Sequence, residues 1–492
     1  MTENAQAMSP MRLNDETLLR QQACIGDHWS DAVGGATVPV FDPASGARIG
    51  TVPCMGQAET VAAIDAAHAA LPGWRARSAK ERAALMRAWF ELVLQHEEDL
   101  AAIMTWEQGK PLHEARAEIR YAASFIEWFA EEGKRVYGDV IPSPSGDKRL
   151  LVVREPIGVC AAITPWNFPA AMIARKAGPA LAAGCTMVVK PANETPFSAL
   201  ALAELALRAG IPAGVLNVVT GDAVAIGSQL TGHPLVSKLS FTGSTPVGRL
   251  LMQQCAGTVK KVSLELGGNA PFIVFDDADI DAAVEGALQA KYRNAGQTCV
   301  CVNRLYVHDA VYDRFVAQFS ARVAQLRVGN GFEHGSEVGP LINGKATDKV
   351  ADLVADAVGK GARVAVGGAA HAAGPGFYAP TVLTEVAPGM RILDEEVFGP
   401  VAPVVRFRGE DQVIRMANDT IYGLAAYFYS RDIGRAWRVA EQLEYGMVGI
   451  NTGLISNEVA PFGGVKQSGL GREGSRYGIE DYMEMKYLCM AV

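Results

Sequence analysis

The sequence lacks the features that would take a protein into a membrane or onto nucleic acid. No run approaches the ~18 consecutive apolar residues of a membrane-spanning helix, and the polar amino-terminal residues include no apolar leader segment. Lys and Arg number 45 against 53 Asp and Glu, a formal net charge of -8, and no basic run could line a phosphate-binding face. We expect a cytoplasmic protein without a membrane or nucleic-acid partner.

Motifs for a catalytic metal and for a disulfide framework are also missing. The eight histidines stand apart, with no His-Glu-x-x-His pattern and no Cys/His pair at metal-ligand spacing. The eight cysteines are scattered over 492 residues, which is typical of a reducing compartment. At roughly 100–200 residues per domain, the length predicts two or three domains. Residues 1–11 are expected to be disordered.

Alternating strand and helix patterns predict an α/β protein. In a first region, short apolar runs separated by Ala/Leu-rich helical segments occur at 159–163, 186–190, 216–219, 237–241 and 260–264. This alternation is typical of a doubly wound parallel sheet. A second alternating region opens with a strand-like segment at 271–275 and a helix-like segment at 279–292, and runs to about residue 471.

Helix starts in the first region indicate where a phosphate would bind. Two Thr-Pro pairs, at 195–196 and 245–246, each place an N-cap residue before a proline at the first helical position. Helix amino ends therefore follow strand carboxyl ends, where free N–H groups and the helix dipole attract phosphates. Gly243 and Ser244, in the Phe-Thr-Gly-Ser segment 241–244, form the best candidate for such a phosphate turn.

Two short strand-like segments, 141–158 and 476–492, do not fit the alternating strand–helix pattern. They suit a hairpin arm that pairs with another subunit, which predicts a homodimer or homotetramer. The predicted division of the chain is a first α/β domain from 12–140 and 159–270, a second from 271–472, and an arm from 141–158 and 473–492.

The residues that carry chemistry centre on Cys299 and Glu265. Cys299 ends the segment Asn-Ala-Gly-Gln-Thr-Cys at 294–299, and Glu265 opens Glu-Leu-Gly-Gly at 265–268. A thiolate can attack a carbonyl carbon and a carboxylate can deprotonate water, so the pair suits formation and hydrolysis of a thioester. Oxidation of an aldehyde to an acid follows that order of steps. Taken singly, each motif is weak. A buried cysteine is usually an inert apolar residue, and a Glu-x-Gly-Gly segment is often a strand end followed by a turn.

Two further segments complete the pattern: Trp-Asn-Phe-Pro at 166–169 and Glu-Val-Phe-Gly-Pro at 396–400. Together with the Cys299 and Glu265 segments, they make the chain resemble the aldehyde dehydrogenase superfamily from about Leu18 onward. The resemblance implies a Rossmann-like cofactor domain (12–140 and 159–270), an α/β catalytic domain that carries the nucleophile, and a small β oligomerisation arm.

The resemblance also implies roles for individual residues. Cys299 is then the nucleophile, the Asn167 side-chain amide a donor to the developing oxyanion, and Glu265 the base that activates the hydrolytic water. The competing interpretation of Asn167 is a turn residue before Phe168-Pro169.

The cofactor implied by the resemblance is NADP or NAD. Lys190 resembles the lysine that binds the adenosine ribose, and Glu396 the glutamate that holds the nicotinamide ribose. Asn193 stands where NAD-preferring relatives often carry a glutamate that repels a 2′-phosphate, which favours NADP with NAD as the alternative. Glu194, next in the chain, could return a carboxylate to the ribose. The remaining residues assigned to the cofactor are Trp166, Gly243, Ser244, Leu266 and Phe398.

Residues 469–474, Gly-Leu-Gly-Arg-Glu-Gly, match the dinucleotide fingerprint G-x-G-x-x-G. No apolar strand immediately precedes the segment, and the chain ends before a βαβ unit could follow. We do not expect these glycines to bind the cofactor.

Three residues point to the substrate. Arg175, Arg293 and Ser456 match positions that bind the distal carboxylate of the substrate in the succinate-semialdehyde dehydrogenase branch of the family. Two arginines and a hydroxyl suit a small anionic aldehyde, since each charge-assisted hydrogen bond contributes roughly 1.5–3 kcal/mol. Glutarate semialdehyde is the nearest rival substrate, and an ion pair with a nearby carboxylate is the alternative role for either arginine.

Other functions remain open at this point. A CoA-acylating dehydrogenase would not need Glu265 as a base, a plain hydrolase would not need Lys190 or Glu396, and a non-catalytic protein would be expected to lose Cys299 or Asn167. Cys301, two residues after the nucleophile, could form a regulatory disulfide with it or be a small buried residue.

Overall fold

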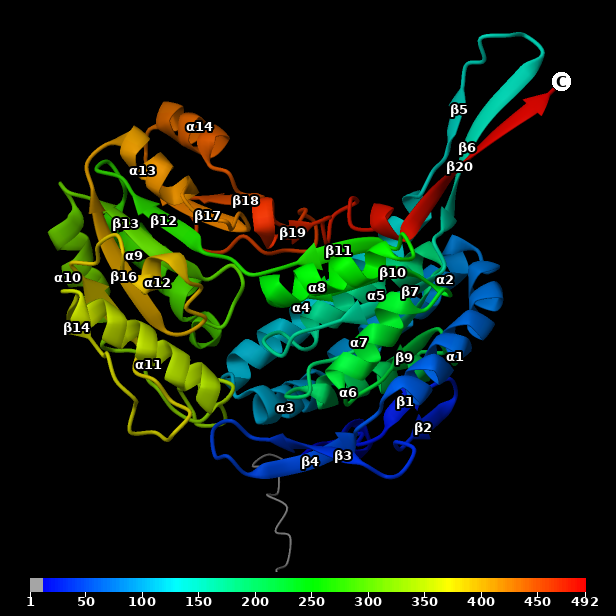
Figure 1. Ribbon diagram of the computed structural model, residues 1–492, viewed down its shortest axis with the longest axis horizontal. Helices are drawn as coiled ribbons and strands as arrows, with labels where there is room; N and C mark the ends of the chain where they lie inside the picture. Colours follow the sequence, from blue (N-terminus) through cyan, green and yellow to red (C-terminus); the bar gives the residue numbers. More distant parts are fainter. Residues whose placement is uncertain (1–11) are drawn as a thin grey trace, which may run out of the picture.

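The computed structural model describes residues 12–492, so the expectation for residues 1–11 lies outside the described residues. Two α/β units lie side by side, and a three-stranded arm projects from one of them (Figure 1). The α/β class predicted from the alternating patterns is confirmed.

The first sheet has eight strands, and the five from β11 to β9 run parallel. These five match the predicted apolar runs to within one residue at either end. In sheet order the strands are β19 (Gly469–Leu470), β11 (Lys261–Glu265), β10 (Val236–Thr242), β7 (Val159–Ile163), β8 (Thr186–Lys190), β9 (Leu216–Val218), β1 (Ala23–Ile25) and β2 (His28–Ser30).

Helices cover both faces of this sheet, as the doubly wound pattern predicts. Cys160 and Ala162 of β7 pack into one hydrophobic core, whereas Val159 and Ala161 of the same strand pack into the core on the opposite face. The helices are α1 (Gln57–Arg75), α2 (Ala79–Gln95), α3 (Glu97–Gln108), α4 (Leu112–Glu132), α5 (Ala171–Ala183), α6 (Pro196–Arg208), α7 (Ala223–Gly232) and α8 (Thr245–Ala256). Shorter elements of this half are η1 (Glu16–Leu18), η2 (Gly133–Arg135) and the hairpin of β3 (Thr37–Phe41) and β4 (Arg48–Pro53).

The two Thr-Pro pairs start helices, one of them a residue earlier than predicted. Thr195 is the N-cap of α6 and Pro196 its first residue, as expected. The prediction for α8 is wrong by one residue, because Ser244 is the N-cap and Thr245 the first helical residue. Ser244 has the extended backbone of an N-cap, and Pro246 is tolerated in second place because N–H groups of the first turn have no acceptor within the helix.

The second sheet has seven strands, all parallel except the edge strand β14. In sheet order they are β14 (Arg363–Val366), β15 (Thr381–Thr384), β16 (Val401–Phe407), β13 (Val302–His308), β12 (Ala270–Val274), β17 (Ala425–Tyr429) and β18 (Met447–Ile450). The helical segments of this unit are α9 (Ile280–Tyr292), η3 (Arg293–Gly296), α10 (Tyr312–Val323), α11 (Gly344–Gly359), α12 (Arg391–Asp394), α13 (Glu410–Asn418), α14 (Ile433–Gln442) and η4 (Lys466–Ser468).

The arm consists of β5 (Asp139–Ile141), β6 (Lys148–Pro156) and β20 (Met483–Ala491), which follows η5 (Glu480–Tyr482). The two predicted segments therefore pair with each other, and β6 and β20 extend away from the body of the molecule (Figure 1). Several apolar side chains of the arm are exposed, among them Val140, Met485, Tyr487 and Met490. Pairing with another subunit stays a prediction.

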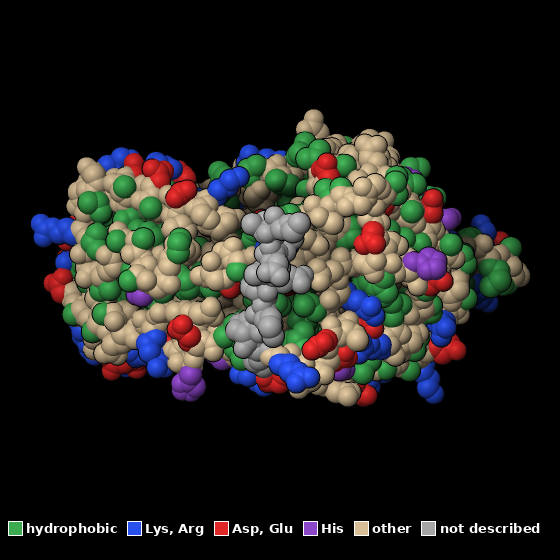
Figure 2. Space-filling model, turned by 90° about the horizontal axis from the view of Figure 1, so that it is seen from below, with side chains coloured by type: hydrophobic (Ala, Val, Ile, Leu, Met, Phe, Trp, Pro, Cys, Tyr) green, Lys and Arg blue, Asp and Glu red, His purple; other side chains and the backbone are tan. Residues whose placement is uncertain are grey.

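Acidic and basic side chains are interspersed over the face shown in Figure 2. Within residues 12–492, no helix combines the length and the apolar character needed to cross a membrane.

Candidate active site

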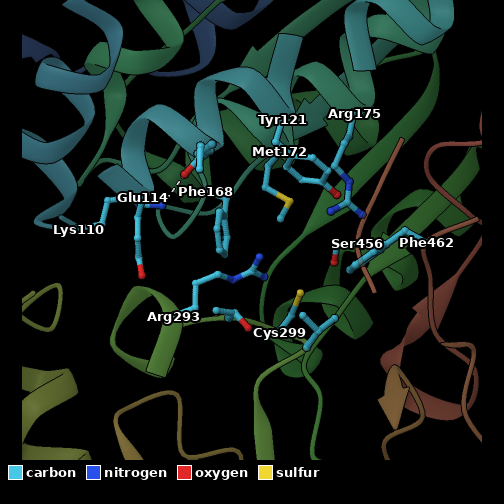
Figure 3. Close-up of a pocket in the computed structure, with 14 residues that line it drawn as sticks. Lys110, Glu114, Tyr121, Phe168, Met172, Arg175, Arg293, Cys299, Ser456 and Phe462 are labelled. Atoms are coloured by element: carbon cyan, nitrogen blue, oxygen red, sulfur yellow. Dashed lines mark hydrogen bonds and ion pairs between the residues drawn. The ribbon is translucent and has the colours of Figure 1, made fainter. Parts of the chain in front are cut away.

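Two cavities meet at Cys299, which is the one residue that lines both. The first, shown in Figure 3, is lined by Lys110, Glu114, Ala117, Glu118, Tyr121, Phe168, Met172, Arg175, Arg293, Thr298, Cys299, Val300, Ser456 and Phe462. The second is lined by Trp166, Asn167, Gly243, Ser244, Leu266, Gly267, Cys299, Lys345, Ala346, Lys349, Glu396, Val397 and Phe398. The structure thus brings the predicted nucleophile to the junction of the predicted substrate and cofactor residues.

The loop that carries Cys299 follows a strained turn after α9. Asn294 and Ala295 have positive φ angles of 51° and 55°, a left-handed conformation that costs energy for residues with a side chain. Surrounding groups hold this turn in place: the Glu114 carboxylate accepts the Asn294 N–H (2.9 Å), and a Cβ on Gly296 would collide with the Gly399 carbonyl. The nucleophile therefore sits on a fixed loop.

The two glycines after Glu265 bring three chain segments together. A Cβ on Gly268 would collide with the Cys299 carbonyl oxygen, and one on Gly267 would lie 2.9 Å from Glu396 Oε2. The Gly268 N–H also donates to Glu396 Oε1 (3.1 Å). Close backbone approach thus explains why glycine follows the candidate base at both positions.

Burial disfavours the ionised form of both candidate reactive groups. Burial raises the pKa of the Cys299 thiol to about 12, and the positive charge of Arg175 offsets this only in part. Burial also raises the pKa of the Glu265 carboxyl well above its usual range, and the neighbouring Glu473 raises it further. Glu265 Oε2 is buried and has no hydrogen-bond partner. A positive charge placed nearby would favour the thiolate and the carboxylate.

Asn167 is buried at the edge of the second cavity, as an oxyanion donor requires. One N–H of its side-chain amide donates to the Gln297 carbonyl (3.0 Å), which leaves the second N–H for a ligand. Its Oδ1 has no hydrogen-bond partner. Asn167 and Cys299 thus line the same cavity, and the oxyanion role of Asn167 stays a prediction.

The second cavity suits a nicotinamide riboside. Gly243 and Ser244 lie at the amino end of α8, where free N–H groups attract a phosphate. Burial raises the pKa of Glu396 to about 7. The hydrogen bond from the Gly268 N–H and the charges of Lys349 and Lys291 act in the opposite direction and favour the carboxylate. Trp166 and Phe398 pack edge to face, with ring centroids 5.5 Å apart. These residues, with Leu266, are the predicted cofactor residues that line this cavity.

Lys190 and Asn193 do not line this cavity but lie three strands away in the same sheet. Lys190 ends β8 and donates to Asn193 Oδ1 (2.8 Å) and to the Pro191 carbonyl (2.9 Å). Burial lowers the pKa of Lys190 to about 8. The span from β8 to β11 is ~14 Å at the usual strand spacing, so a dinucleotide laid across the strand ends would reach from Lys190 to Glu265, the last residue of β11.

The predicted substrate residues Arg175, Arg293 and Ser456 all line the first cavity, and Figure 3 shows both guanidinium groups directed into it. Arg175 Nε lies 2.7 Å from Glu473 Oε2, so the alternative ion-pair role also holds. The Arg175 guanidinium stacks on Phe462 at 3.8 Å, and its buried Nη2 has no hydrogen-bond partner. In the described part of the chain, Arg293 has no carboxylate within ion-pair distance.

Residues 469–474 form no strand–turn–helix unit. Gly469 and Leu470 are the edge strand β19 beside β11, and Glu473 is buried against Arg175 and Lys176. Although burial alone would raise the pKa of Glu473, Lys176 and Arg175 lower it below the usual range. No motif in the sequence indicated this carboxylate.

Other lining residues were also missed. Lys345, Ala346 and Lys349 come from the start of α11, and Lys349 donates to the Glu396 carbonyl (2.7 Å). Lys110, Glu114, Glu118 and Tyr121 come from α4 and the turn before it. The Gln-Gly-Lys-Pro turn at 108–111, between two helical patterns, was the available signal.

Cys301 is buried and lines neither cavity. Its sulfur lies 3.3 Å from Lys291 Nζ, and its thiol lies within 3.5 Å of the Lys291 and Val302 carbonyls. Both Cys299 and Cys301 are free thiols here. Among residues 12–492, no three His, Cys, Asp or Glu side chains are grouped to hold a metal ion.

The aldehyde dehydrogenase family model matches residues 29–488. The chain belongs to the aldehyde dehydrogenase family. It is 65% identical to the NADP(+) succinate-semialdehyde dehydrogenase of Escherichia coli, over 98% of this chain and 100% of that one. It is also 65% identical to the glutarate-semialdehyde dehydrogenase of Pseudomonas putida, over the same shares.

A solved structure gives the same picture. The succinate-semialdehyde dehydrogenase of Burkholderia pseudomallei has a TM-score of 0.97 and 67% identity, over 98% of this chain and 100% of that chain. The chain therefore has the aldehyde dehydrogenase fold and is an NAD(P)-dependent oxidoreductase that acts on aldehydes.

Proposed function

We propose that this aldehyde dehydrogenase oxidises succinate semialdehyde to succinate and prefers NADP to NAD. The observation that carries the proposal is the pair of guanidinium groups in a cavity that ends at Cys299. Within residues 12–492, Arg293 has no carboxylate partner and the buried Nη2 of Arg175 has no acceptor. A substrate carboxylate would supply the missing acceptors while its aldehyde carbon faces the thiol.

Each step of the proposed chemistry is assigned to a named group. Cys299, once it has lost its proton to solvent, attacks the aldehyde carbon as the thiolate, and the free N–H of Asn167 stabilises the oxyanion of the thiohemiacetal. A bound oxidised nicotinamide supplies the hydride acceptor, and the residues of the second cavity would hold it. Glu265 then deprotonates the water that hydrolyses the thioester on Cys299 and releases the acid.

The preference for NADP rests on the residues at the end of β8. The neutral amide of Asn193 is the group beside Lys190 Nζ, whereas the Glu194 side chain is exposed to solvent. A 2′-phosphate on the adenosine ribose would meet a lysine and an amide, while the Glu194 and Asp222 carboxylates, whose charges act on Lys190, lie beyond ion-pair distance of it.

Glutarate semialdehyde is the alternative substrate. It carries the same two functional groups with one more methylene, and a methylene in a pocket changes binding by only ~1–3 kcal/mol. A relative of each specificity is 65% identical to this chain, so overall similarity favours neither.

We further propose that the first α/β unit binds the cofactor, that the second carries the nucleophile, and that the arm joins subunits in a homo-oligomer. The exposed apolar side chains of the arm support the last point.

The test is a panel of succinate semialdehyde, glutarate semialdehyde and acetaldehyde, each with NAD and with NADP, followed by formation of reduced nicotinamide. We expect kcat/KM for the carboxylated aldehydes to exceed that for acetaldehyde by more than about tenfold, ~1.4 kcal/mol. Equal values for acetaldehyde would reduce both arginines to structural roles.

A further inference from the structure

A buried ion pair lies behind the oxyanion residue and touches neither reacting atom. Lys110 and Glu118, whose side chains are each 1% exposed, pair with one another where the turn after α3 meets α4. Lys110 Nζ also donates to the Asn167 carbonyl (2.8 Å) and lies 4.2 Å from the Phe168 ring centroid. One ammonium group therefore joins Glu118 to the backbone of the oxyanion donor.

The other oxygen of Glu118 caps a helix of the active site. Glu118 Oε1 accepts the N–H groups of Ala170 and Ala171 (3.0 and 3.2 Å) at the start of α5. Ala170, the N-cap of α5, has no side chain that could serve, so a carboxylate from α4 takes this part. The same helix carries Arg175, so Glu118 fixes the oxyanion donor and one substrate arginine relative to each other.

Gln108, the last residue of α3, contacts the loop that carries Cys299. Gln108 Nε2 donates to Asn294 Oδ1 (3.0 Å), and Asn294 Nδ2 donates to the Asn167 carbonyl (2.9 Å). The Asn167 carbonyl thus has two donors, one from Lys110 and one from the Cys299 loop. Because both lone pairs of that oxygen are engaged, the peptide after Asn167 is fixed, and with it the direction of the side-chain amide.

We propose that Lys110 and Glu118 are positioning residues that hold the Asn167 amide toward the carbonyl oxygen of the aldehyde attacked by Cys299. The proposal rests on the oxyanion role given to Asn167 above. It holds for whichever aldehyde the enzyme accepts, because the oxyanion forms on every aldehyde.

The test compares a neutral pair with the wild-type pair. Lys110→Met alone would leave the Glu118 charge buried without its partner and would destabilise the fold. In the double variant Lys110→Met/Glu118→Gln both charges are absent, and the glutamine oxygen still accepts the α5 N–H groups. We expect this variant to fold with a melting temperature close to wild type and to lose about tenfold to a hundredfold in kcat, with KM changed less than about threefold.

Glu107→Gln is the matched control. Glu107 is another buried glutamate that caps a helix, accepting the Phe197 and Ser198 N–H groups (2.7 and 2.8 Å) at the start of α6, and it lines neither cavity. Its kcat should stay within about twofold of wild type. An equal loss in this control would show that any buried cap disturbs turnover, and would overturn the proposal.

Two further readouts separate positioning from a general structural effect. Alkylation of Cys299 by iodoacetamide develops no oxyanion, so its rate in the double variant should stay within about twofold of wild type. In an Asn167→Ala background, Lys110→Met/Glu118→Gln should cost less than about threefold, because the residue through which it acts is gone. Effects that multiply fully would overturn the proposal. If Asn167→Ala alone leaves kcat unchanged, the oxyanion role fails first, which is a separate outcome.

Discussion

The two cavities that meet at Cys299 are built differently. The second cavity, proposed for the cofactor, is formed by strand ends, helix amino ends and glycines, in short segments such as 241–244 and 265–268. The first cavity, proposed for the substrate, is formed by side chains from α4, α5 and distant loops. Arg175 there is paired through a long-range contact with Glu473, whereas Arg293 has no ion-pair partner among residues 12–492. Backbone geometry therefore determines the form of the second cavity, whereas charged side chains determine the character of the first.

Replacing Cys299 with alanine removes the group that the two sides share and has the largest expected effect. We expect Cys299→Ala to lower kcat by at least about a thousandfold, since no other residue forms the thioester. Formation of reduced nicotinamide measures the loss, and NADP titration by quenching of tryptophan fluorescence serves as the control. Turnover near the wild-type rate would show that the thiol is not the nucleophile.

The alkylation rate of Cys299 should show that the two cavities act on the thiol in opposite directions. With a pKa of about 12, the thiolate fraction and the iodoacetamide rate should rise about tenfold per pH unit, or about a hundredfold from pH 7 to 9. Oxidised NADP brings a positive ring and should raise the rate at pH 7, whereas succinate brings negative charge and should lower it. A plateau below pH 9 in the free enzyme would contradict the assigned burial effect.

Arg293→Gln should break the substrate side alone. Loss of one charge-assisted bond, ~1.5–3 kcal/mol, corresponds to a fall of about 10–150-fold in kcat/KM for succinate semialdehyde. The value for acetaldehyde and the KM for NADP should hold within about twofold. Arg431→Gln, on an exposed arginine paired with Asp279, is the matched control. A parallel fall for acetaldehyde would assign Arg293 to the fold.

Asn193→Glu should break the cofactor side alone and has the smallest effect. A carboxylate facing a 2′-phosphate costs about 1 kcal/mol at the surface, so kcat/KM for NADP should fall about fivefold to tenfold while that for NAD holds or rises. Asn193→Gln, which stays neutral, should keep the wild-type ratio. An unchanged ratio of kcat/KM for NADP to that for NAD in Asn193→Glu would show that other residues determine the coenzyme preference.

The same contrast explains what the sequence could predict. Cys299, Glu265 and Asn167 each stand in a short contiguous segment that can be recognised in the sequence. The five parallel strands could be predicted because each is a short apolar run. Glu118 and Glu473 carry no local pattern, since Glu118 caps α5 at Ala170 and Glu473 pairs with Lys176, both far along the chain. For Lys110 the turn at 108–111 was the available signal. The start of α8 was placed one residue late because both Ser244 and Thr245 are acceptable caps.

Among residues 12–492 the two cavities share only Cys299, and this bears on the order in which ligands bind and leave. The aldehyde need not pass the dinucleotide on its way to the thiol, and the acid can leave while the dinucleotide stays bound. We expect neither ligand to block the entry of the other, so that initial-velocity plots against aldehyde at several coenzyme concentrations intersect rather than run parallel.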